Sequence, residues 1–341
     1  MKTNERLQNY YNFDEAIVQT IADVAEKQNK LSFRELAASH GLEDGAGRAY
    51  PYKDNRAIEV IHIKPEVDYD ETLLRVYQAP MGITADASMA MRAIRLFDSE
   101  PTTPLLVVGS PTGIGNRTNL IERRDWAVFA RGDLRPVVRP TLQYLFSLGI
   151  SRTEMVGYSY GADAGAAVGA ASYEYGIHTN KAVLMEPAGI EKRALLTLVR
   201  DFQASGAALQ NYVDQTMCPP LLEARGIHNS KVSDTVGFLR WTGGLLRASN
   251  IAIAHGLAEG KFEDQLSTAM IANPAMKATV VWGTASELTS PAAANKSISN
   301  LKSSFTRSRI ESMEMAGMHH GGGDDIDLHA AMVLQGLRPA L

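Results

Sequence analysis

Residues 153–168 of the chain read Thr-Glu-Met-Val-Gly-Tyr-Ser-Tyr-Gly-Ala-Asp-Ala-Gly-Ala-Ala-Val, with the pentapeptide Gly157-Tyr158-Ser159-Tyr160-Gly161 at their centre. A short strand-like run, a G-x-S-x-G turn and a run of small residues predict a strand, a sharp turn and a helix, in that order. A serine on so tight a turn adopts a strained backbone conformation that projects its hydroxyl beyond the sheet. Glycines two residues to either side remove the Cβ atoms that would clash there. We therefore expect Ser159 to be a nucleophile.

Length and composition are those of an ordinary soluble globular protein, with 341 residues, 45% of them hydrophobic and 21% charged. The net charge is −4 and there is no basic stripe, so nucleic acid is not an expected partner. Cys218 is the only cysteine, which excludes an internal disulfide and fits a reducing compartment. Residues 1–10 lack the apolar segment of a secretory signal, and no apolar run reaches membrane-spanning length. We therefore expect a cytoplasmic protein without a membrane span.

Residues 13–40 have helical periodicity, and Ser32-Phe-Arg-Glu35 predicts a capping box that begins a second helix. The turn-rich stretch 41–55 closes this unit. Two helices of this kind can read DNA, but their charges are mixed and they lack a basic face. We interpret residues 1–56 as a helical extension that packs on the rest of the protein.

Strand-like runs then alternate with helical ones. Period-two alternation at 58–62 and 73–77 predicts an antiparallel pair of edge strands, and the continuous apolar run 104–108 predicts a central strand. A helix is expected at about 134–148, and the later runs 153–156, 181–185, 278–282 and 308–315 predict further strands. This rhythm indicates an α/β fold with a doubly wound, mostly parallel sheet.

Residues 191–270 contain no strand-like run but several amphipathic segments. An insertion after the strand that follows the Ser159 turn would lie over the carboxyl ends of the strands, where open α/β sheets bind ligands. We interpret it as a helical cap. The expected division is therefore 1–56 as extension, 57–190 with 271–341 as core, and 191–270 as cap.

Over roughly residues 57–340, this order of elements resembles the α/β-hydrolase family. The resemblance implies a nucleophile at Ser159, an acid after a later strand and a histidine after the last strand. Many members carry G-x-x-D after the penultimate strand, whereas Gly283-Thr-Ala-Ser286 has serine there and Glu287 next. The resemblance therefore implies Glu287 as the acid that orients the histidine. The alternative for Glu287 is an ordinary solvated loop residue.

The implied base lies in the segment 316–323, where the resemblance leaves two neighbouring histidines open. An alignment on Gly317 selects His320, and a loop tighter by one residue selects His319. We prefer His320. The surrounding imidazoles and carboxylates offer a metal site as an alternative, because such clusters can bind zinc or manganese. We expect no metal, because the triad already requires a histidine here and acids suit the start of a final helix. The residues considered are His319, His320, Asp324, Asp325, Asp327 and His329.

The resemblance also implies an oxyanion hole. One donor is expected to be the backbone N–H of Tyr160, and the other is expected from the loop after the 104–108 strand. Pro111 has no N–H, so Ser110 or Thr112 must donate, with Thr112 preferred. The segment Gly109–Gly115 lacks the spacing of a phosphate or dinucleotide loop, so no cofactor is expected.

These residues predict a serine hydrolase that cleaves an ester or related acyl bond through an acyl-enzyme on Ser159. Acyl transfer to another acceptor stays open, as does a catalytically weak or inactive binding protein of the same fold. Phe238, Leu239 and Trp241 in the expected cap favour a partly apolar, small-molecule acyl substrate. The sequence does not specify the oligomeric state.

Overall fold

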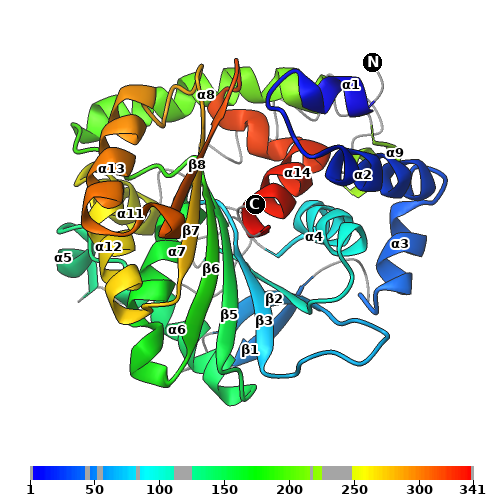
Figure 1. Cartoon of the computed structure of the whole chain (residues 1–341), viewed down its shortest axis with the longest axis horizontal. Helices are drawn as coiled ribbons and strands as arrows, with labels where there is room; N and C mark the ends of the chain where they lie inside the picture. The colour runs from blue at the N-terminus through cyan, green and yellow to red at the C-terminus, as the bar shows by residue number, and fades with distance from the viewer. Residues whose placement is uncertain are drawn as a thin grey trace.

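The computed structural model describes residues 3–42, 47–51, 57–81, 85–110, 125–215, 218–224 and 248–338. Within these residues, eight strands form one sheet in the order β1-β2-β4-β3-β5-β6-β7-β8 (Figure 1). β1 pairs antiparallel with β2 and β2 with β4, whereas all the other pairs are parallel. The strands are β1 (Arg48–Pro51), β2 (Ala57–Ile63), β3 (Leu73–Gln78), β4 (Leu105–Val108), β5 (Arg152–Tyr158), β6 (His178–Met185), β7 (Lys277–Gly283) and β8 (Ile310–Met315). The expected mostly parallel, doubly wound sheet is confirmed.

The expected antiparallel edge pair is wrong. β2 and β3 are not partners, because β4 lies between them, and β3 is the parallel neighbour of β5 near the middle of the sheet. The alternation of Leu73, Arg75 and Tyr77 suggested one polar face. In the structure Arg75 is buried and donates two hydrogen bonds to Glu154 of β5, at 3.0 and 2.8 Å. The charged Arg75 therefore suggested a solvent-facing position in the alternation pattern, although its side chain is buried with a partner.

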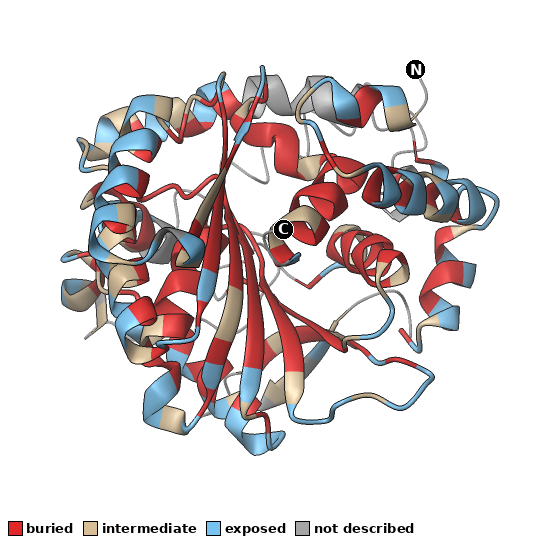
Figure 2. Ribbon diagram, in the orientation of Figure 1, coloured by how far each residue is buried: buried red, intermediate tan, exposed pale blue. Residues whose placement is uncertain are grey.

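Helices cover both faces of the sheet (Figure 1). One layer consists of α6 (Arg135–Ser147), α7 (Tyr160–Ala171), α11 (Ala248–Ala258), α12 (Phe262–Ala272) and α13 (Pro291–Ser304), with the short α5 (Trp126–Phe129), η3 (Ser172–Tyr175) and η4 (Arg307–Arg309). The other layer contains α4 (Ala87–Ser99) and α14 (Ile326–Leu337), which follows η5 (His320–Asp324). Figure 2 shows that α14, α4 and the central strands are buried along most of their length. This makes the fold a three-layer sandwich in which helices cover the central strands on both faces.

The N-terminal extension packs outside α4 and α14. It contains α1 (Thr3–Gln8), α2 (Glu15–Gln28) and α3 (Phe33–Ser39), and the capping box of Ser32 with Glu35 is confirmed. Leu7, Phe13 and Ile21 are buried in the same apolar cluster as Met318 and Ile326 of the core. β1 lies within the stretch 41–55 and pairs with β2, so this stretch is not only a turn and contributes a strand to the sheet.

The helical stretch between β6 and β7 is confirmed as free of strands in its described residues. It contains α8 (Leu195–Gln215), α9 (Pro219–Ala224), α11 and α12. α12 packs against α7, so the boundary expected at residue 270 falls inside a helix of the core layer. Residues 225–247 of the expected cap, with Phe238, Leu239 and Trp241, lie outside the described residues. Among the residues described, no helix has both the length and the apolar character needed to cross a membrane.

Candidate active site

Ser159 lies on the turn between β5 and α7, with φ 59° and ψ −130°. Positive φ is strained for a residue with a side chain, and close packing of the surrounding backbone maintains it here. A Cβ on Gly157 would overlap the backbone of Gly161, and a Cβ on Gly161 would overlap the carbonyl oxygen of Gln78 at the end of β3. Both glycines are therefore required by close backbone contacts, as the pentapeptide predicts.

His320 is the histidine that faces Ser159. Its Nε2 lies 2.9 Å from the Ser159 Oγ, and both residues are buried, with exposed fractions of 6% and 4%. The ring of Tyr158 stacks on the imidazole at a centroid distance of 5.5 Å, and the Tyr158 hydroxyl donates to the His320 carbonyl oxygen. Burial, with Asp324 nearby, raises the pKa of Tyr158 well above its ordinary value, so this hydroxyl stays protonated and able to donate.

The carboxylate on the other side of the imidazole belongs to Glu186, the residue directly after β6. Its Oε2 lies 2.9 Å from His320 Nδ1, and the residue is fully buried. Oε1 accepts from the backbone N–H of Gly283 at 2.5 Å, and Oε2 accepts from the Ser286 hydroxyl at 2.5 Å. Like Ser159, Glu186 has a positive φ, of 53°. A carboxylate held by this set of donors has its hydrogen-bonding capacity satisfied without water.

Glu287, the expected acid, does not reach the ring of His320, which corrects the sequence-based expectation. Its Oε1 lies 2.6 Å from His319 Nδ1, and its Oε2 accepts a long bond of 3.4 Å from the backbone N–H of His320. The His319 side chain is 43% exposed. His319 is the extended residue before η5 and His320 is the first residue of that turn. Their side chains point to different places, so His320 faces Ser159 and Glu186 while His319 faces Glu287.

Glu186 is not among the residues expected from the sequence, because the acid is expected in the loop after β7. The parallel strands β6 and β7 end at the same edge of the sheet, so a side chain from either can approach the same histidine. Two sequence signals were available. An acid stands directly after the buried run 181–185, and Ser286 occupies the position where the family often has aspartate.

Asp163 of α7 holds the loop that follows Glu186. Its carboxylate accepts from the N–H of Ala188 at 3.0 Å and from that of Gly189 at 3.2 Å. A Cβ on Gly189 would lie 2.5 Å from the Asp163 Oδ1, so the loop approaches the carboxylate as closely as its backbone allows. Burial raises the pKa of Asp163 to about 7, although these two N–H groups favour its charged form. The helix α7 and the loop after Glu186 are thus joined by one buried carboxyl group.

The loop that meets the Ser159 turn is the one after β3. Gln78 ends β3 against Gly161, and β3 is the strand next to β5, whereas the β4 considered from sequence is one strand further away. The N–H of Ala79 donates to Val108 and Pro80 has none, so Met81 is the first residue of this loop with an N–H left for an anion. The N–H of Tyr160, in the first turn of α7, has no acceptor within the helix. Thr112 lies outside the described residues, and its expected role stays a prediction.

The acids near the start of α14 serve ion pairs. Asp324 pairs with Arg92 at 2.6 Å, and Asp325 and Asp327 both pair with Arg6. Burial, with Arg92 nearby, lowers the pKa of His329 well below its ordinary value, so this imidazole is neutral. In the described part of the chain, no group of three or more histidine, cysteine or acidic side chains is placed to hold a metal ion.

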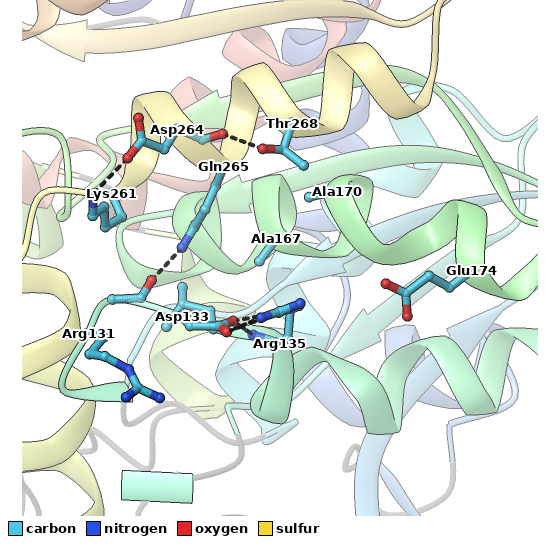
Figure 3. Close-up of a pocket in the computed structure, with 12 residues that line it drawn as sticks. Arg131, Asp133, Arg135, Ala167, Ala170, Glu174, Lys261, Asp264, Gln265 and Thr268 are labelled. Atoms are coloured by element: carbon cyan, nitrogen blue, oxygen red, sulfur yellow. Dashed lines mark hydrogen bonds and ion pairs between the residues drawn. The ribbon is translucent and has the colours of Figure 1, made fainter. Parts of the chain in front are cut away.

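A pocket of about 380 Å³ opens elsewhere, between α6, α7 and α12 (Figure 3). Four of its charged side chains form two ion pairs: Arg135 with Asp133 at 2.6 Å, and Lys261 with Asp264 at 2.8 Å. Gln265 donates to the carbonyl of Gly132 at 2.9 Å across the pocket wall. Neither Ser159 nor His320 lines this pocket, so it is distinct from the site around the nucleophile turn.

No protein-family model matches the sequence, and no curated protein is significantly similar to it. Solved structures are similar in fold. A hydrolase from Pseudomonas aeruginosa superposes with a TM-score of 0.54 at 13% identity, covering 86% of this chain and 99% of that one. The 2-hydroxy-6-oxo-6-phenylhexa-2,4-dienoate hydrolase of a Rhodococcus species gives a TM-score of 0.53 at 14% identity, covering 86% and 98%. A proline iminopeptidase from Mycobacterium smegmatis gives 0.51 at 13% identity, covering 85% and 99%. At these identities the likeness is one of fold.

Proposed function

Because this chain has the α/β-hydrolase fold, and because Ser159, His320 and Glu186 form a continuous line of hydrogen bonds in it, we propose that it hydrolyses an ester or related acyl bond of a small molecule. The observation that carries the proposal is this line, with 2.9 Å from Ser159 Oγ to His320 Nε2 and 2.9 Å from His320 Nδ1 to Glu186 Oε2. Both distances are those of formed hydrogen bonds between a nucleophile, a base and the group that orients the base.

The proposed reaction has two halves. The Ser159 Oγ attacks the acyl carbon while His320 Nε2 takes its proton, and the N–H groups of Tyr160 and Met81 stabilise the oxyanion. Collapse of this intermediate breaks the bond to the leaving alkoxide, which receives the proton from His320 and departs as alcohol. Water then attacks the acyl-enzyme and loses a proton to His320. The bond between the acyl carbon and Ser159 Oγ breaks, His320 returns the proton to this oxygen, and the acid product leaves.

Glu186 supports this chemistry better than Glu287 does. It accepts from His320 Nδ1, so the proton is fixed on Nδ1 and Nε2 is left as the base that faces Ser159. When His320 becomes positively charged during the reaction, the buried Glu186 carboxylate lies against it and stabilises that charge. Ser286 and Gly283 keep the carboxylate in place from β7, the strand on which the acid was expected.

The burial of Ser159 and His320 supports a covered pocket. α8 contacts η5, the turn that carries His320, so part of the helical stretch 191–270 lies next to the proposed base. A cover of this kind excludes water and shapes the acyl or alcohol pocket. We propose that the stretch acts as a cap and that the substrate is partly apolar.

A fluorophosphonate probe tests the proposal directly. We expect covalent labelling of the folded wild-type protein at Ser159, located by peptide mass spectrometry, and none in Ser159→Ala. A series of nitrophenyl esters of increasing acyl length should show turnover that also depends on Ser159. Labelling with acyl transfer to added alcohols and little hydrolysis would indicate an acyltransferase. A folded wild-type protein that is not labelled would indicate a binding protein without this catalysis.

A further inference from the structure

Arg6 of the N-terminal extension is buried against the start of α14. Its Nη2 donates to Asp327 Oδ2 at 2.7 Å, and its Nη1 pairs with Asp325. The three side chains are nearly inaccessible to solvent, with Arg6 6% exposed. A charge so deeply buried is expensive unless its partners are well placed, so this cluster fixes the position of α1 relative to α14.

Asp325 connects this cluster to His320. It is the N-cap of α14, where its Oδ1 accepts from the N–H of Asp327 at 3.0 Å and from that of Leu328 at 3.1 Å. Only η5, a short helical turn, separates it from His320, and its own N–H donates to Gly322 inside that turn. A shift of Asp325 is therefore transmitted to the proposed base through a few buried residues.

The same extension also holds the chain before His320. The N–H of Ala316, directly after β8, donates to the carbonyl of Tyr10 at 2.8 Å. Leu7 and Phe13 pack in the apolar cluster that includes Met318. The segment 316–325, which contains His320, is thus attached at both ends to residues 6–13.

We propose that Arg6 is a positioning residue for His320 and that residues 6–13 clamp the histidine-bearing segment 316–325. Buried ion pairs contribute little net stability compared with well-packed apolar groups, whereas their geometry is directional. An apolar residue at position 6 could keep α1 packed on α14, but it could not specify where Asp325 lies. The catalytic part of this inference rests on the proposed function, whereas the clamp itself does not.

The test compares Arg6→Met with Arg75→Met. Arg75 is an equally buried arginine paired with Glu154, but it lies in β3 and contacts no part of the 316–325 segment in the hydrogen bonds and ion pairs of the described residues. In both variants a buried, charged arginine is replaced by an uncharged methionine of similar volume. Each is measured at a temperature where circular dichroism shows that it is folded.

The first readout is hydrogen exchange followed by mass spectrometry, which requires no catalysis. We expect faster exchange of peptides covering 316–325 in Arg6→Met and wild-type exchange there in Arg75→Met. The second readout is kinetic. A misplacement of the base of about 1 Å should lower kcat and the rate of fluorophosphonate labelling by about 10- to 100-fold, with KM changed less than about twofold. Arg6→Lys should recover part of the rate, and added guanidinium at low millimolar concentration should partly rescue Arg6→Ala but not wild type.

Wild-type exchange in segment 316–325 of folded Arg6→Met would overturn the clamp. Faster exchange with an unchanged labelling rate would overturn the positioning role and leave Arg6 purely structural. If the wild-type protein is itself not labelled at Ser159, the proposed function fails, and the exchange experiment still decides whether the clamp exists.

Discussion

The ring of Tyr158 lies face to face with the imidazole of His320, at a centroid distance of 5.5 Å and an interplanar angle of 25°. The Tyr158 hydroxyl donates to the carbonyl oxygen of the same histidine. Tyr158 is also the residue before Ser159, so one side chain from the nucleophile turn supports the proposed base at its ring and at its backbone. Arg92 of α4 lies over the ring of Tyr158, 5.8 Å from its centroid, so α4 also contacts this pair of rings.

Tyr158→Phe keeps the ring and removes the hydroxyl. The His320 carbonyl then loses a buried donor, at a cost of about 1 kcal/mol, and we expect kcat for an ester substrate to fall about five- to tenfold. Tyr77→Phe is the matched control, because the Tyr77 hydroxyl is also buried but contacts Arg92 rather than His320. Equal losses in both variants would show that Tyr158 acts only through general packing.

Glu186→Gln and Glu287→Gln separate the two carboxylates near the histidines. Loss of the acid that orients a triad histidine lowers kcat by about 10⁴-fold in the best-studied case, and we expect about 10³- to 10⁴-fold for Glu186→Gln. Glu287 contacts His319 and only the backbone of His320, so Glu287→Gln should change kcat by less than about threefold. Initial rates with a nitrophenyl ester would measure both. A larger loss of kcat in Glu287→Gln than in Glu186→Gln would indicate that Glu287, in the loop after β7, is the acid.

Ser286→Asp should have opposite effects in two backgrounds. In the wild-type protein the new carboxylate would face Glu186, because the Ser286 hydroxyl lies 2.5 Å from Glu186 Oε2, and mutual repulsion should lower activity. In Glu186→Gln it would supply the missing negative charge near His320 and should raise kcat at least about tenfold above Glu186→Gln alone. Ser286→Asn in the same background is the control, because asparagine is similar in size to aspartate but uncharged. If Ser286→Asn restores kcat equally, the negative charge is not the cause of the recovery.

Asp163→Asn should change how stability depends on pH. The folded carboxyl has a pKa raised to about 7 by burial, above the ordinary value of 3.8, so between these values the folded state keeps a proton that the unfolded state releases. The stabilising contribution is complete below about pH 4 and is lost as pH rises to about 7, with a slope of up to about 1.4 kcal/mol per pH unit.

Urea unfolding of wild type and Asp163→Asn at several pH values from 4.5 to 8 would measure this slope as the difference between their free energies of unfolding. Asp133→Asn is a suitable control, because Arg135 offsets burial and lowers the pKa of Asp133, which places its own effect below this range. Parallel stability curves for wild type and Asp163→Asn would contradict the prediction.

Local features of the structure could be predicted from the sequence, whereas two tertiary features could not. The Ser159 turn and the Ser32–Glu35 capping box are set by neighbouring residues, so pattern and spacing were enough to predict their conformations. The acid was not predictable in this way, because whether Glu186 or Glu287 reaches His320 depends on strand order and on the positive φ of Glu186. The central position of β3 was hidden because Arg75 is buried with a partner 79 residues away along the chain.

The contact between Arg6 and Asp327 joins residues 321 positions apart. During synthesis Arg6 is made 321 residues before Asp327. At typical rates of about 5–20 residues per second, the extension waits roughly 15–60 s for its partner. Until then Leu7 and Ile21 lack the apolar surface of α14 that completes their cluster. The nascent chain therefore exposes the apolar surface of residues 7–21, which chaperones can bind, and the segment that carries His320 can be clamped only after Asp327 has been made.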